Sequence, residues 1–456
     1  MPKVMQQNGF FLGNYGDKRI DSNMAKLYQS VHDKQEISLK KLGEDRAKEV
    51  AFGRALSNEK VEHSIMSKAL AAQTNKNCIN VPHILVPQDT VETTYPTQPI
   101  KKESFGYTTH KETKGIFTQG AVAINASNSE VLGVAAIMSW SRGDYDEASN
   151  NNKDSAIEEK ESSKWQACAE SAKEQLSNPD MITFIGDRES DIVEYFMKVI
   201  DERTHIISRA RSDRMLATEE KISERLVRLV ESYKKIILLP VTRERKKERE
   251  AEFEIKFCQV QILAKDGETV IKMYCVQALE IGEVPAGEER VSWVLLTSHP
   301  VRTLKKALRI LKWYSWRWIV EEIHRVMKKQ GIAIESSQLE TVRSLLNLSV
   351  ICYATAVKIM LLVKARDGSE QDARHYFRKS ELRLLEILNI KLSGKTEKQQ
   401  NPHKKNTIGW VAWVIARLGS WHCYGKKPGP ITMSNGYREF QSLYKGYSLI
   451  LQKDIS

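Results

Sequence analysis

The chain lacks the marks of a disulfide-bonded, zinc-binding or secreted protein. Its six cysteines are scattered through 456 residues without a Cys-x-x-Cys pair, so neither a disulfide framework nor a structural zinc site is expected. The first residues, Met-Pro-Lys-Val, do not begin the continuous apolar segment of a signal peptide. A reducing cytoplasm is the compartment that fits these absences.

Long apolar runs and two familiar catalytic loops are missing as well. The most apolar stretch, 344–363, is interrupted by Asn347 and Lys358, so we expect a buried core helix rather than a membrane span. No Gly-x-x-x-x-Gly-Lys-Ser/Thr loop is present, so nothing indicates nucleotide hydrolysis. No Gly-x-Ser-x-Gly elbow, the signature of many serine hydrolases, is present either.

Acidic residues are outnumbered by basic ones. The chain carries 70 Lys and Arg against 58 Asp and Glu, a net charge of +12, and its last 84 residues alone hold 15 basic and 5 acidic side chains. An anionic partner is therefore favoured. Nucleic acid is the first candidate, although membranes and acidic proteins would also attract this charge.

Hydrophobic periodicity predicts an α/β core flanked by helical regions. Short helices are expected over residues 1–75, followed by alternating strands and helices. The expected elements of the core are strands at 83–86, 116–124 and 131–140, a helix at 163–176, a strand at 182–185, a helix at 192–200 and a strand at 205–208. This order is typical of a mixed sheet of the ribonuclease H type.

The rest of the chain completes three expected regions: 1–75, 76–372 and 373–456. Within the central region a β-rich insertion is expected at about 210–290. It would contain a polar helix at 219–232 and strands at 253–257 and 270–274. The core would resume with a strand at 293–297 and one long helix at 311–330. The last region is expected to be helical.

Two aspartates follow apolar strands. Asp187 comes after the strand at 182–185, and Asp89 stands shortly after the strand at 83–86. Sheets of this class bind ligands at the carboxyl ends of strands, although a single Asp there is more often a turn or cap residue. With Glu321 they would form a carboxylate cluster that can bind two divalent ions and act on a phosphodiester. Mg²⁺ fits such ligands, with Mn²⁺ as a substitute.

The helix expected at 311–330 is polar along one side. At about 100° per residue, a single stripe is formed by Tyr314, Arg317, Glu321 and Lys328. Arginine and lysine bind phosphate oxygens and glutamate binds hard cations, so the stripe suits a site that holds both. The same pattern on an isolated helix more often marks a solvated face.

Three motifs stand out when they are taken together. They are Asp-Arg-Glu-Ser-Asp at 187–191, Trp-Val-Leu-Leu-Thr-Ser-His-Pro-Val at 293–301, and the spacing from Tyr314 to Lys328 just described. In these motifs the chain resembles the DDE transposases of the insertion-sequence-four family, and weaker similarity extends over nearly the whole chain.

The resemblance implies a cut-and-paste transposase acting on double-stranded transposon ends. Asp89, Asp187 and Glu321 would be the catalytic, metal-binding triad, with about two Mg²⁺ ions per active site. Water would nick one strand, the freed 3′ hydroxyl would form a hairpin, and a second water would reopen it. The 3′ end would then attack target DNA.

The resemblance also implies how DNA is held. The DNA-binding residues would be Tyr314, Arg317, Lys328, Trp293 and Arg188, with Trp293 stacking on a base that leaves the duplex. Taken alone, Trp293 would be interpreted as strand core. Residues 1–75 would recognise the transposon end, and 373–456 would form a homodimer in the synaptic complex. The expected location is the bacterial cytoplasm, on the nucleoid, with no membrane partner.

One departure from the family leaves alternatives open. The family has an apolar strand running into Asp-Thr-Thr, whereas this chain has Pro87 two residues before Asp89. Proline is disfavoured in a central strand, so either Pro87 lies beyond the last paired residue or Asp89 is placed differently. The alternative functions are a metal-dependent nuclease or resolvase without strand transfer, and a catalytically inactive DNA-binding relative.

Overall fold

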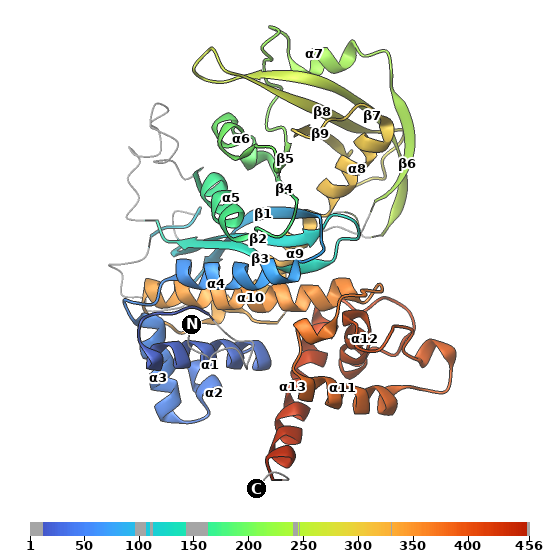
Figure 1. Ribbon diagram of the computed structural model, residues 1–456. Helices are drawn as coiled ribbons and strands as arrows, with labels where there is room; N and C mark the ends of the chain where they lie inside the picture. Colours follow the sequence, from blue (N-terminus) through green and yellow to red (C-terminus); the bar gives the residue numbers. More distant parts are fainter. Residues whose placement is uncertain are drawn as a thin grey trace.

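The computed structural model describes residues 12–95, 106–109, 113–142, 163–239, 245, 247–329 and 331–453. Over these ranges the chain is a mixed α/β protein, as expected, built on one nine-stranded sheet. Its strands lie in the order β3-β2-β1-β4-β5-β9-β8-β7-β6. Figure 1 shows helices α4 and α10 directly against β1–β3, with helices from both ends of the chain beyond them.

Six strands form the central part of the sheet. They are β1 (His83–Thr94), β2 (Gly115–Asn125), β3 (Val131–Trp140), β4 (Met181–Gly186), β5 (Thr204–Arg209) and β9 (Ser292–Thr297). The first three form the predicted antiparallel meander, and β4 and β5 run parallel to β1. β9 returns antiparallel to β5. The carboxyl ends of β4 and β5 therefore meet at one edge, beside the second half of β1.

The β-rich insertion extends the same sheet. Its strands are β6 (Tyr233–Leu239), β7 (Arg249–Leu263) and β8 (Val270–Ile281), which pair antiparallel with one another and, through β8, with β9. The expected helix at 219–232 is shorter, as α7 (Ile222–Val227). Val227 and Val230 are exposed, so the apolar packing that would lengthen this helix is missing.

Helices surround the sheet. They are α1 (Lys18–Lys34), α2 (Leu39–Gly43), α3 (Arg46–Ser57), α4 (His63–Asn77), α5 (Lys164–Gln175), α6 (Val193–Val199), α8 (Leu304–Ser315), α9 (Trp318–Lys328), α10 (Val342–Ala365), α11 (Lys379–Leu392), α12 (Ile408–Leu418) and α13 (Pro430–Lys453). The helices expected at 163–176 and 192–200 are confirmed as α5 and α6. Both faces of the central strands are covered.

The two faces of the sheet pack on different helices. Phe184 of β4 shares a buried cluster with Trp165 of α5, whereas Leu85 of β1 and Ile185 of β4 belong to the cluster that contains α8, α9 and α10. Alternate residues of a strand point to opposite faces. The odd-numbered residues of β1 and β4 therefore point toward α8–α10.

The prediction of one helix at 311–330 was wrong, because α8 and α9 are separate helices. Between them the amides of Trp316 and Arg317 bond to carbonyls three residues earlier, as in a 3₁₀ turn. No glycine or proline marks this bend, and the apolar period continues through it. Gln330 lies outside the described residues.

β1 is longer than the strand predicted at 83–86, and Pro87 lies inside it. Pro87 is the last residue paired with β4, opposite Ile185. The ladder to β2 skips Val86 and Pro87 and resumes at Gln88, where the pairing of β2 with β3 is also irregular. The missing proline N–H thus falls at a gap in the ladder, and β1 continues unbroken to Asp89.

α10 connects the sheet to both ends of the chain, packing against β3, α1, α3, α12 and α13. Among the described residues it is the one helix long and apolar enough to cross a membrane, and 89% of its most apolar segment is buried inside the fold. This burial agrees with the expectation of a core helix.

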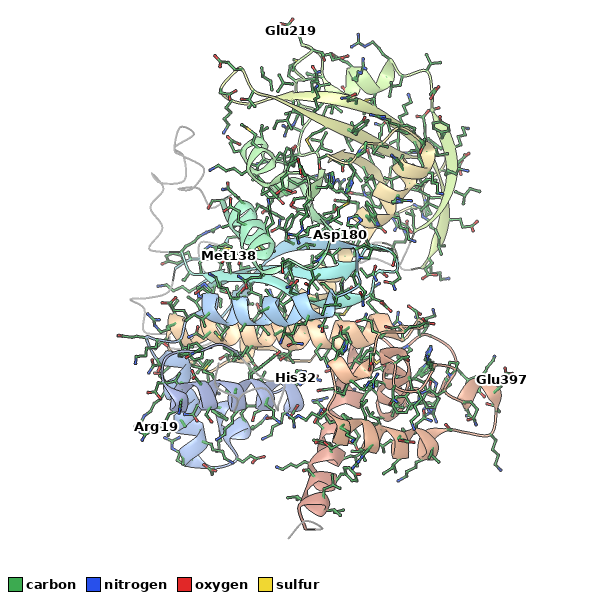
Figure 2. All side chains as sticks on the ribbon, in the orientation of Figure 1. Arg19, His32, Met138, Asp180, Glu219 and Glu397 are labelled. Atoms are coloured by element: carbon green, nitrogen blue, oxygen red, sulfur yellow. The ribbon has the colours of Figure 1, made fainter. Side chains whose placement is uncertain are left out.

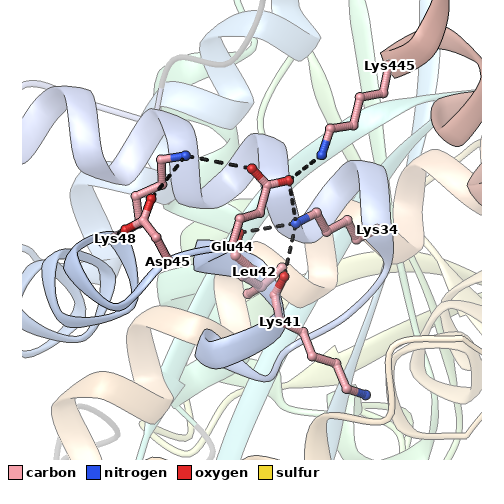
Figure 3. Close-up of polar contacts among 7 residues, drawn as sticks. All are labelled: Lys34, Lys41, Leu42, Glu44, Asp45, Lys48 and Lys445. Atoms are coloured by element: carbon pink, nitrogen blue, oxygen red, sulfur yellow. Dashed lines mark hydrogen bonds and ion pairs between the residues drawn. The ribbon is translucent and has the colours of Figure 1, made fainter.

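The two ends of the chain also meet directly. Glu44, at the end of α2, accepts hydrogen bonds from Lys445 of α13 at 2.6 Å and Lys34 of α1 at 3.2 Å (Figure 3). These bonds lower the pKa of Glu44 to about 2. Nearby, His32 of α1, which is labelled in Figure 2, contacts the Tyr437 hydroxyl of α13 at 3.0 Å. The N-terminal helices and α13 therefore pack together.

Candidate active site

Neighbouring strands bring four functional side chains to one end of the sheet. They are Asp89 of β1, Asp187 after β4, Arg209 of β5 and Trp293 of β9. Each lies an even number of residues from a core residue of the face that packs on α8–α10, namely Leu85, Ile185, Ile207 and Leu295. Since strand side chains alternate, all four point toward α8 and α9.

Asp89 and Asp187 occupy matching positions beyond the parallel pair of β1 and β4. Pro87 is opposite Ile185, and each aspartate comes two residues later. Asp187 keeps extended backbone, and its Oδ1 accepts from the Glu189 amide at 2.8 Å to cap the 3₁₀ turn η3 (Arg188–Ser190). Asp187 is therefore a cap residue, as the simpler interpretation expected, and also a neighbour of Asp89.

Asp89 carries the clearest sign that the carboxylates are close. Its side chain is 22% exposed. Burial raises its pKa to about 7; the carboxylates of Asp187 and Glu321 add to the rise, and Arg317 opposes it. Such a rise is typical of a buried carboxylate that has other negative charges nearby. The structure thus brings together the three acidic residues that the sequence singled out.

Arg317 contacts two of these carboxylates. Its Nη2 donates to Oε1 of Glu321 at 2.5 Å, and its Nη1 lies 3.7 Å from Oδ2 of Asp89. Only 9% of the residue is exposed. Burial alone would lower its pKa, but Tyr314, Glu321 and Asp89 outweigh that effect and raise it. Arg317 is therefore a permanent positive charge inside the site.

Tyr314 and Trp293 form an aromatic wall next to Arg317. Their ring centroids are 5.5 Å apart in an edge-to-face arrangement. Tyr314 is buried and Trp293 is partly exposed. Burial raises the pKa of Tyr314, against the opposing charges of Arg317 and Arg209. The phenol is therefore neutral and can donate a hydrogen bond.

Arg209 is a member of the site that the sequence interpretation missed. Its Nη2 donates to the carbonyl of Ser292 at 2.9 Å. Burial lowers its pKa, a hydrogen bond with Tyr314 opposes this, and the charge of Arg188 adds to the lowering. The predicted strand ended at 208, one residue too early. Because β5 runs parallel to β4, extending the predicted strand by one residue would have placed Arg209 at the end of the sheet where Asp187 lies.

Arg188 and Lys328 are the other two basic residues that the sequence singled out. Arg188 is exposed and close enough to Arg209 to affect its pKa. Lys328 donates to the carbonyl of Glu92 at 2.8 Å and pairs with Oε1 of Glu335 at 3.0 Å. Lys328 therefore fastens the end of α9 to β1.

The carboxylates have the chemistry of a site for a hard divalent cation. Within the described ranges, no three or more His, Cys, Asp and Glu side chains are arranged to enclose a metal ion, and Arg317 supplies the positive charge near Asp89 and Glu321. Carboxylate oxygens are nevertheless the ligands that Mg²⁺ and Mn²⁺ prefer. Burial, with a smaller contribution from the neighbouring carboxylates, raises the pKa of Asp89, and a bound cation would oppose that rise. Asp89, Asp187 and Glu321 thus have the ligand chemistry for such ions, but as placed they do not enclose one.

Comparison with known proteins bears on the same region. Residues 160–356 match the family model described as the transposase DDE domain, a range that includes Asp187 and Glu321 but not Asp89. A solved structure of the piggyBac transposase synaptic complex with hairpin DNA shares 10% identity, covering 98% of this chain and 76% of that chain, with a TM-score of 0.31. A score this low is no sign of a shared fold. The family match agrees with the resemblance to DDE transposases, and the narrower insertion-sequence-four assignment stays a prediction.

Proposed function

We propose that this protein is a DDE transposase that cuts and joins DNA with the help of divalent metal ions. The placement of three carboxylates carries the proposal: Asp89 and Asp187 each follow the paired residues Pro87 and Ile185 by two positions, and Arg317 contacts both Asp89 and Glu321. The transposase DDE domain match over 160–356 supports it. The strand order β3-β2-β1-β4-β5 supports the assignment of the core to the ribonuclease H type.

The residues around the carboxylates would divide the work. Ions bound by the triad, Mg²⁺ or Mn²⁺, would activate a water or sugar hydroxyl and stabilise the leaving oxygen of a phosphodiester. Arg317 and Arg209 would hold phosphate oxygens. The neutral Tyr314 phenol would donate a hydrogen bond beside them. Trp293, partly exposed next to Tyr314, would stack on a base that leaves the duplex.

The steps and partners follow the family. Nicking would be followed by hairpin formation, hairpin opening and strand transfer into target DNA. The helices before β1 would recognise the transposon end, and a homodimer would form in the synaptic complex. Arg188 and Lys328 would contact the DNA backbone, and the positive net charge favours that partner.

A product assay tests this function against a nuclease or resolvase. The protein is incubated with Mg²⁺, with DNA carrying the terminal sequences that flank its gene, and with a supercoiled target. Hairpins and joined products would support transposition. Nicks without joined products would identify the nuclease, and DNA binding without cleavage in either Mg²⁺ or Mn²⁺ would identify the inactive relative.

A matched pair of variants on α9 tests whether DNA cleavage depends on Glu321. Glu321→Gln removes a charged ligand with little change of shape, so it should bind DNA and cut none. Glu322→Gln is the control, because Glu322 pairs with Arg325 at 2.6 Å instead of facing Asp89. If Glu321→Gln cleaves DNA at the rate of the control, Glu321 is not part of the active site.

A further inference from the structure

A pocket with a mostly apolar wall and a basic side lies at the amino-terminal end of β1, away from Asp89 and Asp187 at the other end of the strands. It has a volume of about 670 Å³ and is lined by the start of β1, the turn between β2 and β3, and one side of α8. Its polar lining residues are Asn80, His83, Asn125, Ser127, Lys305, Arg309 and Lys312. None of these residues belongs to the candidate active site.

The pocket is positively charged. Lys305, Arg309 and Lys312 follow one another at intervals of four and three residues, so they share one side of α8. All three are exposed, and no Asp or Glu lines the pocket. In the described part of the chain, none of the three forms an ion pair. Their charge is therefore available to an anion from solution.

The walls of the pocket are held together by hydrogen bonds. Trp313 Nε1 donates to the carbonyl of Ala126 at 2.9 Å, and the Ala126 amide donates to the carbonyl of His83 at 3.1 Å. Within the turn, Asn125 Oδ1 accepts from the Ser127 amide at 3.0 Å and hydroxyl at 2.7 Å. These bonds join α8, β1 and the β2–β3 turn, so the pocket is preformed.

The basic side of the pocket suits phosphate, and the remaining wall is mostly apolar. Its aromatic residue, Trp313, is only 7% exposed and its ring is in edge contact with His83 at 4.8 Å, so no free ring face is offered for stacking. Lysine and arginine supply charge, and the side-chain NH₂ groups of Asn80 and Asn125 can donate hydrogen bonds to phosphate oxygens. Contacts of this kind position a duplex without selecting its sequence.

We propose that this pocket binds the phosphate backbone of duplex DNA, as a second contact apart from the carboxylates. The inference rests on the proposed function, which makes DNA the polyanion. His83 and Asp89 are six residues apart on β1, roughly 20 Å at about 3.3 Å per residue. A duplex held at the carboxylates can therefore reach the pocket along α8 within about six base pairs at 3.4 Å each.

Charge removal tests the pocket. The variant Lys305→Gln, Arg309→Gln and Lys312→Gln loses three charges from it. The control, Lys234→Gln, Lys235→Gln and Lys272→Gln, loses three exposed charges from β6 and β8. Binding of a short fluorescent duplex is measured without metal over a range of salt. Loss of three phosphate contacts should reduce the slope of log Kd against log salt by about 2.7 in the pocket variant, with a much smaller change in the control.

A crosslinking experiment serves where the triple variant does not fold. Five cysteines are buried and Cys423 is partly exposed, so Ser127→Cys in a Cys423→Ser background gives one accessible thiol at the pocket. A photoactivatable group attached there should crosslink to duplex DNA, and the same group at Lys235→Cys should not.

The outcomes separate the two proposals. Equal salt slopes in the two triple variants would contradict the proposal that the pocket binds DNA. Equal crosslinking from positions 127 and 235 would contradict it as well. If the unaltered protein binds no duplex DNA even at low salt, the proposed function fails as well. Loss of cleavage in Glu321→Gln tests the carboxylates alone and does not depend on the pocket.

Discussion

Nη1 of Arg317 lies 3.7 Å from Oδ2 of Asp89, while Nη2 of the same residue donates to Glu321. Arg317 therefore joins a carboxylate from the first core strand to one from a helix more than 200 residues later in the chain. Removing one partner of a buried ionic group is costly because it leaves the others uncompensated. The guanidinium is also the group best suited to phosphate, so DNA and the carboxylates compete for it.

Asp89→Asn should stabilise the folded protein at high pH. The pKa of about 7 in the folded state exceeds the ordinary value of 3.8. The stabilisation from the bound proton is therefore complete below about pH 4 and is lost as the pH rises to 7. Since asparagine does not ionise, the variant should gain between one and about 4 kcal/mol in unfolding free energy at pH 8.

Urea unfolding at pH 4 and pH 8, followed by tryptophan fluorescence, measures this gain. The difference between variant and parent should be small at pH 4. An equal difference at the two pH values would show that ionisation of Asp89 does not change the unfolding free energy.

Mg²⁺ should raise the melting temperature. A ligand that binds only the folded state stabilises by about 2.7 kcal/mol at one hundred times its Kd. Asp187→Asn and Glu321→Gln should lose most of this response, and Glu322→Gln should keep it. Thermal unfolding in a Mg²⁺ titration measures the effect, and a chelator should reverse it. A full response in Asp187→Asn would exclude Asp187 as a ligand.

Arg317→Ala should destabilise the fold more at pH 8 than at pH 5. It leaves Asp89 and Glu321 without their shared cation, a loss of about 3 kcal/mol for a buried group. At pH 5, protonation of Asp89, whose pKa is about 7, removes part of the repulsion. Arg317→Lys should recover only part of the loss, since lysine cannot make the forked contact.

The matched control for Arg317 is Arg325→Ala on the same helix. Arg325 is about half exposed and pairs with Glu322 at 2.6 Å, so its loss should change stability by less than about 1 kcal/mol. Chemical denaturation of all three variants gives the comparison. Similar losses for Arg317→Ala and Arg325→Ala would contradict the bridging role.

Trp293→Ala should weaken the holding of an unstacked base, by about 1–3 kcal/mol, whereas Trp293→Phe should keep much of it. A 2-aminopurine base at the end of the DNA reports the effect, since its fluorescence rises when it leaves the duplex and falls when it stacks on a ring. If Trp293 is strand core alone, both variants should lower stability and leave this signal unchanged.

Asp187 and Glu321 could be predicted from the sequence because local patterns define their surroundings. Asp187 ends an apolar strand, and Glu321 lies on a polar stripe of an amphipathic helix. Asp89 was harder to assign, since Pro87 suggested the end of a strand. The gap in the β1–β2 ladder at Val86 and Pro87 depends on the neighbouring strand, which single-strand rules do not consider.

The features of the site that could not be predicted from the sequence depend on tertiary packing. Periodicity described Tyr314 and Arg317 as a stripe, yet both are buried, because Trp293 and the carboxylates cover them. The bend between α8 and α9 has no breaker residue, and Arg209 joins the site only through the pairing of β5 with β4 and β9. These features arise from contacts between segments distant in the chain.

The bend between α8 and α9 fixes the direction in which Glu321 points. A helix turns by about 100° for each residue, so deletion of a single codon between Trp316 and Glu321 would rotate the carboxylate together with the buried Ile323, Val326 and Met327. The core side chains and the carboxylate lie on one helix, so the length of the bend cannot change without loss of either the packing or the chemistry.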